Sequence, residues 1–334
     1  MDANLIAAIG VIAAALLFAF TNGFHDSANA IATSISTRAL KPRTALAMAA
    51  IGNFVGAYLG GEVASTVAKG LVDLPVSQDG LIMVLAGVLG SIGWNYLAWY
   101  FGWPISASHS LLGGVVGATL AGVGSAGVIW SGLLTKVALP TVVSPLVGFG
   151  IGFLVMLGVY WVFRKGRPDK LNRGFRHAQS VSAAAMAVGH GMQDAAKTIG
   201  IIVLALYVGG YQEEATHIDW WVYIVAALAL ALGTYQGGWR IIKTLGRRII
   251  DLHPPQGFAA ETVASAVLFG NTIIGAPIST THIITSAIMG VGSTGGKRAV
   301  RWGVARNIVM AWILTFPTAA LAGAILYFPI TWIF

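Results

Sequence analysis

Long apolar runs, separated by short polar connections, dominate the chain. Ten runs are long enough to enter or cross a bilayer, because about 20 apolar residues span its hydrocarbon core. They cover residues 5–36, 44–66, 81–101, 104–121, 142–163, 178–208, 219–238, 258–275, 277–291 and 303–329. The pattern predicts an all-α, polytopic membrane protein with about 10–12 transmembrane segments, some of them broken or re-entrant.

Two polar motifs recur within these runs. "NGFHDSANAIATSI" (22–35) is similar to "HGMQDAAKTIGIIV" (190–203), which aligns Asp26 with Asp194. "GWPISASHSLLGG" (102–114) is similar to "GAPISTTHIITSA" (275–287). Both motifs return in the same order after about half the chain. We therefore expect a first repeat over 1–163, a basic cytoplasmic linker over 164–177 and a second repeat over 178–334.

The distribution of charge predicts the topology. Sixteen of the 20 Lys and Arg residues lie in four short connections. They are Arg38, Lys41 and Arg43; Arg164, Lys165, Arg167, Lys170, Arg173 and Arg176; Arg240, Lys243, Arg247 and Arg248; and Lys297, Arg298 and Arg301. Basic connections mark the cytoplasmic side, so we expect both termini outside the cell membrane. The loop after the first Asp motif is basic and the loop after the second is acidic, which predicts repeats of inverted topology.

Composition excludes several classes of protein. Hydrophobic residues make up 56% of the 334 residues and charged residues only 10%, against about 25% in soluble domains. The net charge of +8 lies in short loops and does not indicate nucleic-acid binding. Cysteine is absent, which excludes disulfides and thiolate metal sites. The first apolar run lacks a basic leader, so no cleaved signal peptide is expected, and no cofactor motif is present.

The motif Pro-Ile-Ser-x-[Ser/Thr]-His predicts an anion site. A proline suits the first position of a helix, so we expect Pro104 and Pro277 to begin helices. The first turn of a helix exposes unpaired N–H groups and the positive end of the dipole, which favour oxyanions. The candidate anion-binding residues are Ser106, Ser108, His109, Ser279, Thr280, Thr281 and His282. The alternatives are ordinary capping by Ser and Thr at a re-entrant turn, and packing roles for the two histidines.

The Asp motif predicts a coupling site, because an ionisable residue inside a membrane segment is functional by default. The candidates for binding a cation or proton are Asn22, His25, Asp26, Asn29, Gln193, Asp194, Lys197 and Glu261. In a sodium-coupled protein Asp26, Asn29 and Asp194 would ligate the metal. The run 5–36 is too long for one straight crossing, so we expect an interrupted helix there. The alternatives are structural aspartates at helix ends, and a Lys197 that either neutralises Asp194 or attracts the anion.

The duplicated Gly-x-x-Asp-x-Ala-Asn signature, with the duplicated Pro-x-Ser-x-[Ser/Thr]-His motif, resembles the inorganic phosphate transporter (PiT) family over nearly the whole chain. The resemblance implies a homodimeric symporter that moves phosphate with a cation. It implies that Asp26, Asn29 and Asp194 serve coupling, and that the Ser and Thr residues after Pro104 and Pro277 serve phosphate. Glu261 matches a family glutamate that is important for transport.

Two positions depart from the family pattern. His25 and Gln193 stand where asparagine is common. The His form resembles bacterial low-affinity members, which are thought to couple phosphate to protons and often carry a metal–phosphate complex. It therefore favours protons over sodium.

We therefore expect a secondary active phosphate symporter, driven by a proton or other cation gradient through alternating access. The alternative within transport is a symporter of sulfate or another tetrahedral oxyanion. A channel is disfavoured because the polar residues gather in two clusters instead of forming a continuous lining. An enzyme is disfavoured because no nucleophile elbow or catalytic metal pattern accompanies the Ser, His and Asp residues.

Overall fold

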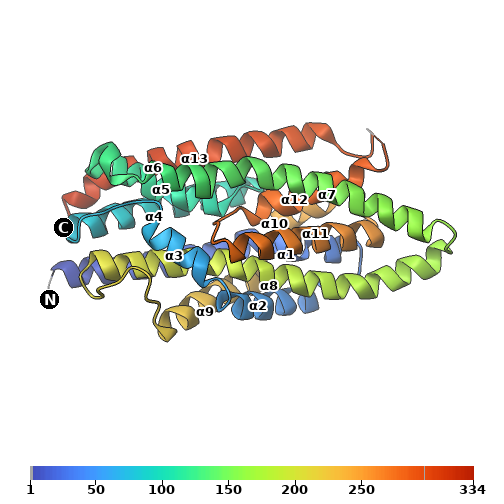
Figure 1. The fold of residues 1–334 in the computed structure, drawn as a ribbon, viewed down its shortest axis with the longest axis horizontal. Helices are drawn as coiled ribbons and strands as arrows, with labels where there is room; N and C mark the ends of the chain where they lie inside the picture. The colour runs from blue at the N-terminus through green and yellow to red at the C-terminus, as the bar shows by residue number, and fades with distance from the viewer. Residues whose placement is uncertain (1–2, 297) are drawn as a thin grey trace.

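The molecule consists of helices, most of which run along one common direction (Figure 1). The computed structural model describes residues 3–296 and 298–334. The first part of the chain forms α1 (Ala3–Ser36), α2 (Pro42–Ala57), α3 (Gly61–Lys69), α4 (Gln78–Phe101), α5 (Ala107–Gly122), α6 (Trp130–Gly132) and α7 (Leu139–Phe163). The second part forms α8 (Pro168–Val208), α9 (Trp220–Gln236), α10 (Trp239–Lys243), α11 (Pro254–Ile273), α12 (Thr280–Ser293) and α13 (Trp302–Thr331). A 3₁₀ turn (Gly124–Gly127) and two π-helical turns (Leu133–Ala138 and Thr244–Arg248) complete the helical elements.

The helices confirm an all-α membrane protein with broken segments. Five helical stretches are long and apolar enough to cross a bilayer, or up to seven if each of two bent pairs counts as one span. The pair α2–α3 bends by 66°, and α9 bends by 60° against the helix that follows it. The helices α5 and α12 have 16 and 14 residues, which at about 1.5 Å per residue is shorter than a bilayer core of about 30 Å. All ten predicted runs thus become helices, but several are too short to cross a bilayer alone.

The two helices with the Asp motifs are unbroken, and the expectation of an interruption there is wrong. The helix α1 runs for 34 residues and α8 for 41 residues. Their polar side chains bond to groups on neighbouring helices. The backbone therefore has no need to unwind to satisfy them.

The helices of the two halves pack against one another reciprocally. The helix α1 packs on α9, and its counterpart α8 packs on α2. In the same way α5 packs on α13, and its counterpart α12 packs on α7. Each half therefore supplies the surface on which the other half folds.

Glycines allow this close packing at equivalent places. A Cβ atom on Gly23 would lie 2.4 Å from the carbonyl oxygen of Leu230, and one on Gly191 would lie 2.4 Å from that of Asn53. Small residues let helix backbones approach closely in a membrane. Glycine therefore permits the close helix contact at both places.

The ends of the molecule agree with the charge pattern. Both termini lie at one end, and the turn between α7 and α8 lies at the other (Figure 1). At that second end α1 stops against the turn Thr244–Arg248. There too Arg301 pairs with Asp251 at 2.8 Å, and the Phe175 and Phe258 rings lie 5.6 Å apart. The basic connections thus gather opposite the termini, as predicted, while Lys297 lies outside the described residues.

Replacing Gly117 or Gly290 with alanine is expected to destabilise the protein. Their added Cβ atoms would lie 1.9 Å and 2.1 Å from the carbonyl oxygens of Ala320 and Phe149, and overpacking costs about 1–3 kcal/mol. The measurement is the melting temperature of the detergent-solubilised protein. Gly93→Ala is the matched control, because nothing lies within 4 Å of that position. Equal melting temperatures for all three variants would contradict the reciprocal packing.

Candidate functional site

The first turns of α5 and α12 are capped by serines. Ser106 Oγ accepts a hydrogen bond from the His109 N–H at 3.1 Å, and Ser279 Oγ accepts one from the His282 N–H at 3.2 Å. The prediction that the prolines begin these helices is wrong, because the helices begin three residues later, at Ala107 and Thr280. A serine side chain satisfies an unpaired N–H of the first turn, which proline cannot do. Capping, the alternative to anion binding, therefore describes Ser106 and Ser279.

The two capped turns meet each other. Ser108 Oγ donates a hydrogen bond to the Ile278 carbonyl at 3.4 Å. The ring centroids of His109 and His282 lie 4.8 Å apart, and His282 also lies against Trp312 at 4.0 Å. The N-termini of two short helices from opposite halves therefore lie side by side inside the protein.

The first turn of α12 connects the two aspartates. Asn29 Nδ2 donates to Thr280 Oγ1 at 3.2 Å and to Thr281 Oγ1 at 2.9 Å. Thr281 Oγ1 donates to Asp26 at 3.4 Å, and Thr280 Oγ1 donates to Asp194 at 3.5 Å. The predicted anion turn and the predicted coupling residues therefore form one network.

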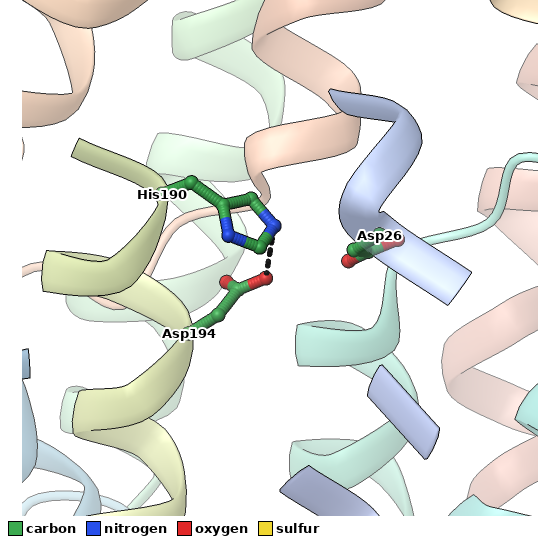
Figure 2. A group of neighbouring side chains, drawn as sticks. All are labelled: Asp26, His190 and Asp194. Carbon is green, nitrogen blue, oxygen red and sulfur yellow. Dashed lines mark ion pairs between the residues drawn. The ribbon is translucent and has the colours of Figure 1, made fainter. Parts of the chain in front are cut away.

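Asp26 and Asp194 face each other together with His190 (Figure 2). His190 Nε2 lies 3.0 Å from Asp194 Oδ2 on the same helix. One ligand atom from each of the three residues lies within 4.8 Å of the others, an arrangement that could hold a metal ion. On the other side, His25 Nδ1 lies 2.7 Å from Asp26 Oδ1.

The sequence analysis missed His190. Its Nδ1 lies 2.9 Å from Asn53 Oδ1, and Asn53 Nδ2 donates to Thr234 Oγ1 at 2.8 Å. The sequence does indicate that His190 lies near Asp194, because it precedes that residue by four positions and so shares its helix face. It also aligns with Asn22 at the start of the repeated motif.

Lys197 brings a positive charge into the same network. Its Nζ donates to Ser108 Oγ at 2.5 Å, to the Ile278 carbonyl at 2.8 Å and to Asp194 Oδ1 at 3.0 Å. The side chain is 1% exposed. Lys197 thus contacts both capped turns and one of the two aspartates.

Gln193 holds the backbone of the turn before α12. Its Nε2 donates to Thr272 Oγ1 at 2.9 Å and to the Ala276 carbonyl at 3.2 Å, while its Oε1 accepts from the Ile278 N–H at 3.1 Å. These bonds use both ends of the amide. The structure therefore places Gln193 against the turn instead of among the carboxylates.

Glu261 forms a second buried cluster. Its carboxylate accepts hydrogen bonds from Ser182 Oγ at 2.5 Å, from Gln179 Nε2 at 3.1 Å and from Thr33 Oγ1. Thr33 follows Asp26 by seven residues on α1, about 10 Å along the axis. Its three hydrogen-bond donors are hydroxyl and amide groups. Glu261 therefore lies between the central network and the basic end of the molecule.

Comparison with known proteins identifies the family. Residues 22–323 match the model described as the phosphate transporter family. The chain belongs to the phosphate transporter family. Over 334 residues it is 42% identical to a probable low-affinity inorganic phosphate transporter of Bacillus subtilis (strain 168), covering 100% of both chains. It is 46% identical to a protein of the same description in Rhizobium meliloti (strain 1021), with 98% of each chain covered.

A solved structure shares the fold of this phosphate transporter. That structure, described as the sodium-dependent phosphate transporter, aligns with a TM-score of 0.89 at 24% identity and covers 100% of both chains. The family and its relatives are transporters, not enzymes. The chain is therefore a multi-pass membrane protein of phosphate transport.

Removing the serine caps is expected to reduce stability. Ser106→Ala and Ser279→Ala should each lower the free energy of unfolding by about 1 kcal/mol, because one N–H of each first turn loses its acceptor. Thermal unfolding of the purified protein measures the change. Ser293→Ala, in the last turn of α12, is the control, since among the described residues its Oγ bonds the Met289 carbonyl of its own helix and caps no N–H. If the cap variants melt with the control, the serines do not act as caps.

Proposed function

We propose that this phosphate transporter is a secondary active symporter, in which phosphate binds between the first turns of α5 and α12. A cation or proton binds beside it at Asp26 and Asp194. The observation that carries the proposal is the meeting of both capped turns and both aspartates in one hydrogen-bonded network.

The chemistry of the two turns fits a tetrahedral oxyanion. Two helix N-termini direct their positive dipole ends and N–H groups at one place. The hydroxyl groups of Ser108, Thr280 and Thr281 supply further donors, and the Lys197 ammonium supplies a positive charge. We assign phosphate binding to these residues, with His109 and His282 beside them and the two serine caps holding the turns.

The groups around Asp26 offer ligands for more than one kind of coupling ion. Asn22 Oδ1 and Asn29 Oδ1 are buried and accept no hydrogen bond from any described group. Together with the carboxylate they form an oxygen-rich set that suits a hard cation. The solved relative is described as sodium-dependent, which supports sodium, whereas His25 next to Asp26 supports protons. The donors of Asp26, His190 and Asp194 also suit a divalent metal that accompanies phosphate.

Closure of the site supports alternating access. Ser108 is 4% exposed, Asp26 is 2% exposed and Asp194 is fully buried. A substrate can therefore reach this network only after the helices move. We propose that the halves 1–163 and 178–334 are inverted repeats that rock against each other. In this proposal both termini lie outside the cell, the basic end faces the cytoplasm and the protein is a homodimer, as the resemblance implies.

Sulfate or another tetrahedral oxyanion is the alternative substrate, because helix N-termini and hydroxyls recognise shape and charge. The carboxylates favour phosphate, since they can accept a proton from the ligand, and sulfate has no such proton near neutral pH. Competition of labelled phosphate uptake by sulfate separates the two substrates.

Loss of both central carboxylates is expected to remove coupling. In proteoliposomes, the Asp26→Asn, Asp194→Asn double variant should accumulate phosphate at least about tenfold less than the wild type, because breaking buried charge pairs costs several kcal/mol. Uptake is measured with proton and sodium gradients imposed separately, with and without a divalent metal. Asp251→Asn is the control, because Asp251 is 82% exposed. Full uptake by the double variant would contradict the proposed coupling role of Asp26 and Asp194.

Replacing Glu261 with glutamine is expected to flatten the pH dependence of phosphate uptake. The amide retains the shape of the side chain but can no longer exchange a proton between the central network and the basic end. The measurement is the initial uptake rate across a pH series at fixed membrane potential. Glu62→Gln is the control, because Glu62 is an exposed carboxylate on α3. An unchanged pH profile in Glu261→Gln would exclude this residue from proton transfer.

A further inference from the structure

The surroundings of Lys197 resemble a cation site more than an ordinary salt bridge. The three donors of its ammonium group meet one hydroxyl, one backbone carbonyl and one carboxylate oxygen. The carbonyl belongs to Ile278, which lies in the non-helical turn before α12. Hydroxyl, carboxylate and free backbone carbonyl oxygens at such turns are the groups that coordinate monovalent cations in transporters.

The equivalent position in the first half carries no charge. Asn29 aligns with Lys197, and Thr281 aligns with Ser108. Asn29 Nδ2 donates to Thr281 Oγ1 at 2.9 Å, just as Lys197 Nζ donates to Ser108 Oγ at 2.5 Å. The two halves thus make the same contact, one with a neutral amide and the other with an ammonium group.

The difference in charge leaves the two aspartates in different environments. Asp194 Oδ1 lies 3.0 Å from the ammonium of Lys197. Asp26 has no lysine or arginine within ion-pair distance among the described residues, and the buried Oδ1 atom of Asn29 lies unpaired on the same helix. His25 Nδ1 and Thr281 Oγ1 contact one oxygen of Asp26, while Asn29 Oδ1 has no partner among the described groups. No lysine or arginine of the described residues therefore fills the first half, whereas the ammonium of Lys197 fills the second.

We propose that the Lys197 ammonium is a tethered cation, which permanently fills the place that a free monovalent cation would take in the second half. The proposal rests on the proposed symport function and deepens it. A tethered charge cannot be carried across the membrane, so only the first half binds a transported cation. Lys197 thereby lowers by one the number of cations that the transporter couples to each phosphate.

The test is to convert the second site to the form of the first. Lys197→Asn removes the ammonium and supplies the same amide as Asn29. Equilibrium binding of radioactive sodium to the purified protein should rise by one ion per chain relative to the wild type. Sodium, compared with choline, should also raise the melting temperature of Lys197→Asn more than that of the wild type, because a ligand of the folded state stabilises it.

Two control variants separate the site from general effects. Lys197→Met removes the charge without supplying an oxygen, so it should gain no sodium ion. Lys136→Asn makes the same substitution at a half-buried lysine outside the network, whose Nζ donates to the Ile274 carbonyl, and it should bind sodium as the wild type does. Binding in detergent needs no transport, and phosphate uptake by the wild type and Lys136→Asn in proteoliposomes tests the proposed function separately.

Two outcomes with Lys197→Asn would overturn the proposal. One is the same sodium stoichiometry in Lys197→Asn and the wild type. The other is a Lys197→Asn protein that does not accumulate in folded form in sodium-containing medium, because the proposal requires a sodium ion to replace the ammonium. An equal gain of sodium in Lys197→Met would also count against it, since the amide oxygen would then play no part.

Discussion

Buried charge is the constraint on which the structure depends. Asp26, Asp194 and Lys197 are each at most 2% exposed in a chain whose outer surface faces lipid. An isolated charge in such a place costs many kcal/mol, so each must lie against a partner that is fixed in position. Some partners lie on the same helix, as Lys197 does for Asp194 and His25 for Asp26. Others lie across the two halves, since Lys197 reaches Ser108 and Thr281 reaches Asp26. The fold can therefore be understood as the packing that brings these pairs together.

Short helices and glycines make that packing possible. The helices α5 and α12 begin inside the protein. Their N-terminal turns therefore place N–H groups and the positive ends of the helix dipoles beside the carboxylates and the proposed substrate site. The unbroken α1 and α8 pass beside these turns and contribute side chains. The Asp motifs therefore lie within continuous helices, whereas the Pro-Ile-Ser motifs lie where helices begin. Gly23 and Gly191 then allow the neighbouring helices to approach within reach of hydrogen bonds.

Periodic and repeated features could be predicted from the sequence, and features decided by a distant partner could not. Hydropathy located the ten apolar runs that form helices, and the repeated motif singled out Asp26 and Asp194 as candidate site residues. The preference of proline for the first position of a helix gave a wrong helix start at Pro104. The helix is capped instead by Ser106, whose side chain satisfies an N–H of the first turn, which a proline cannot do. His190 was overlooked although its spacing from Asp194 was visible, since its place near Asp26 depends on another helix. The contacts of Gln193 depend on the path of a turn that no local pattern reveals.

The reciprocal packing of the halves also determines which contacts can form early and which can form only late during translation. The helix α5 packs on α13, which follows it by about 180 residues in the chain, and Asn29 of α1 bonds to Thr281 of α12. During translation the first half therefore enters the membrane with Asp26 and the short α5 lacking their final neighbours. The central network can form only after α12 has been inserted, because Thr280 and Thr281 belong to that helix. The first half therefore passes through a stage of translation in which these buried polar groups lack their final partners.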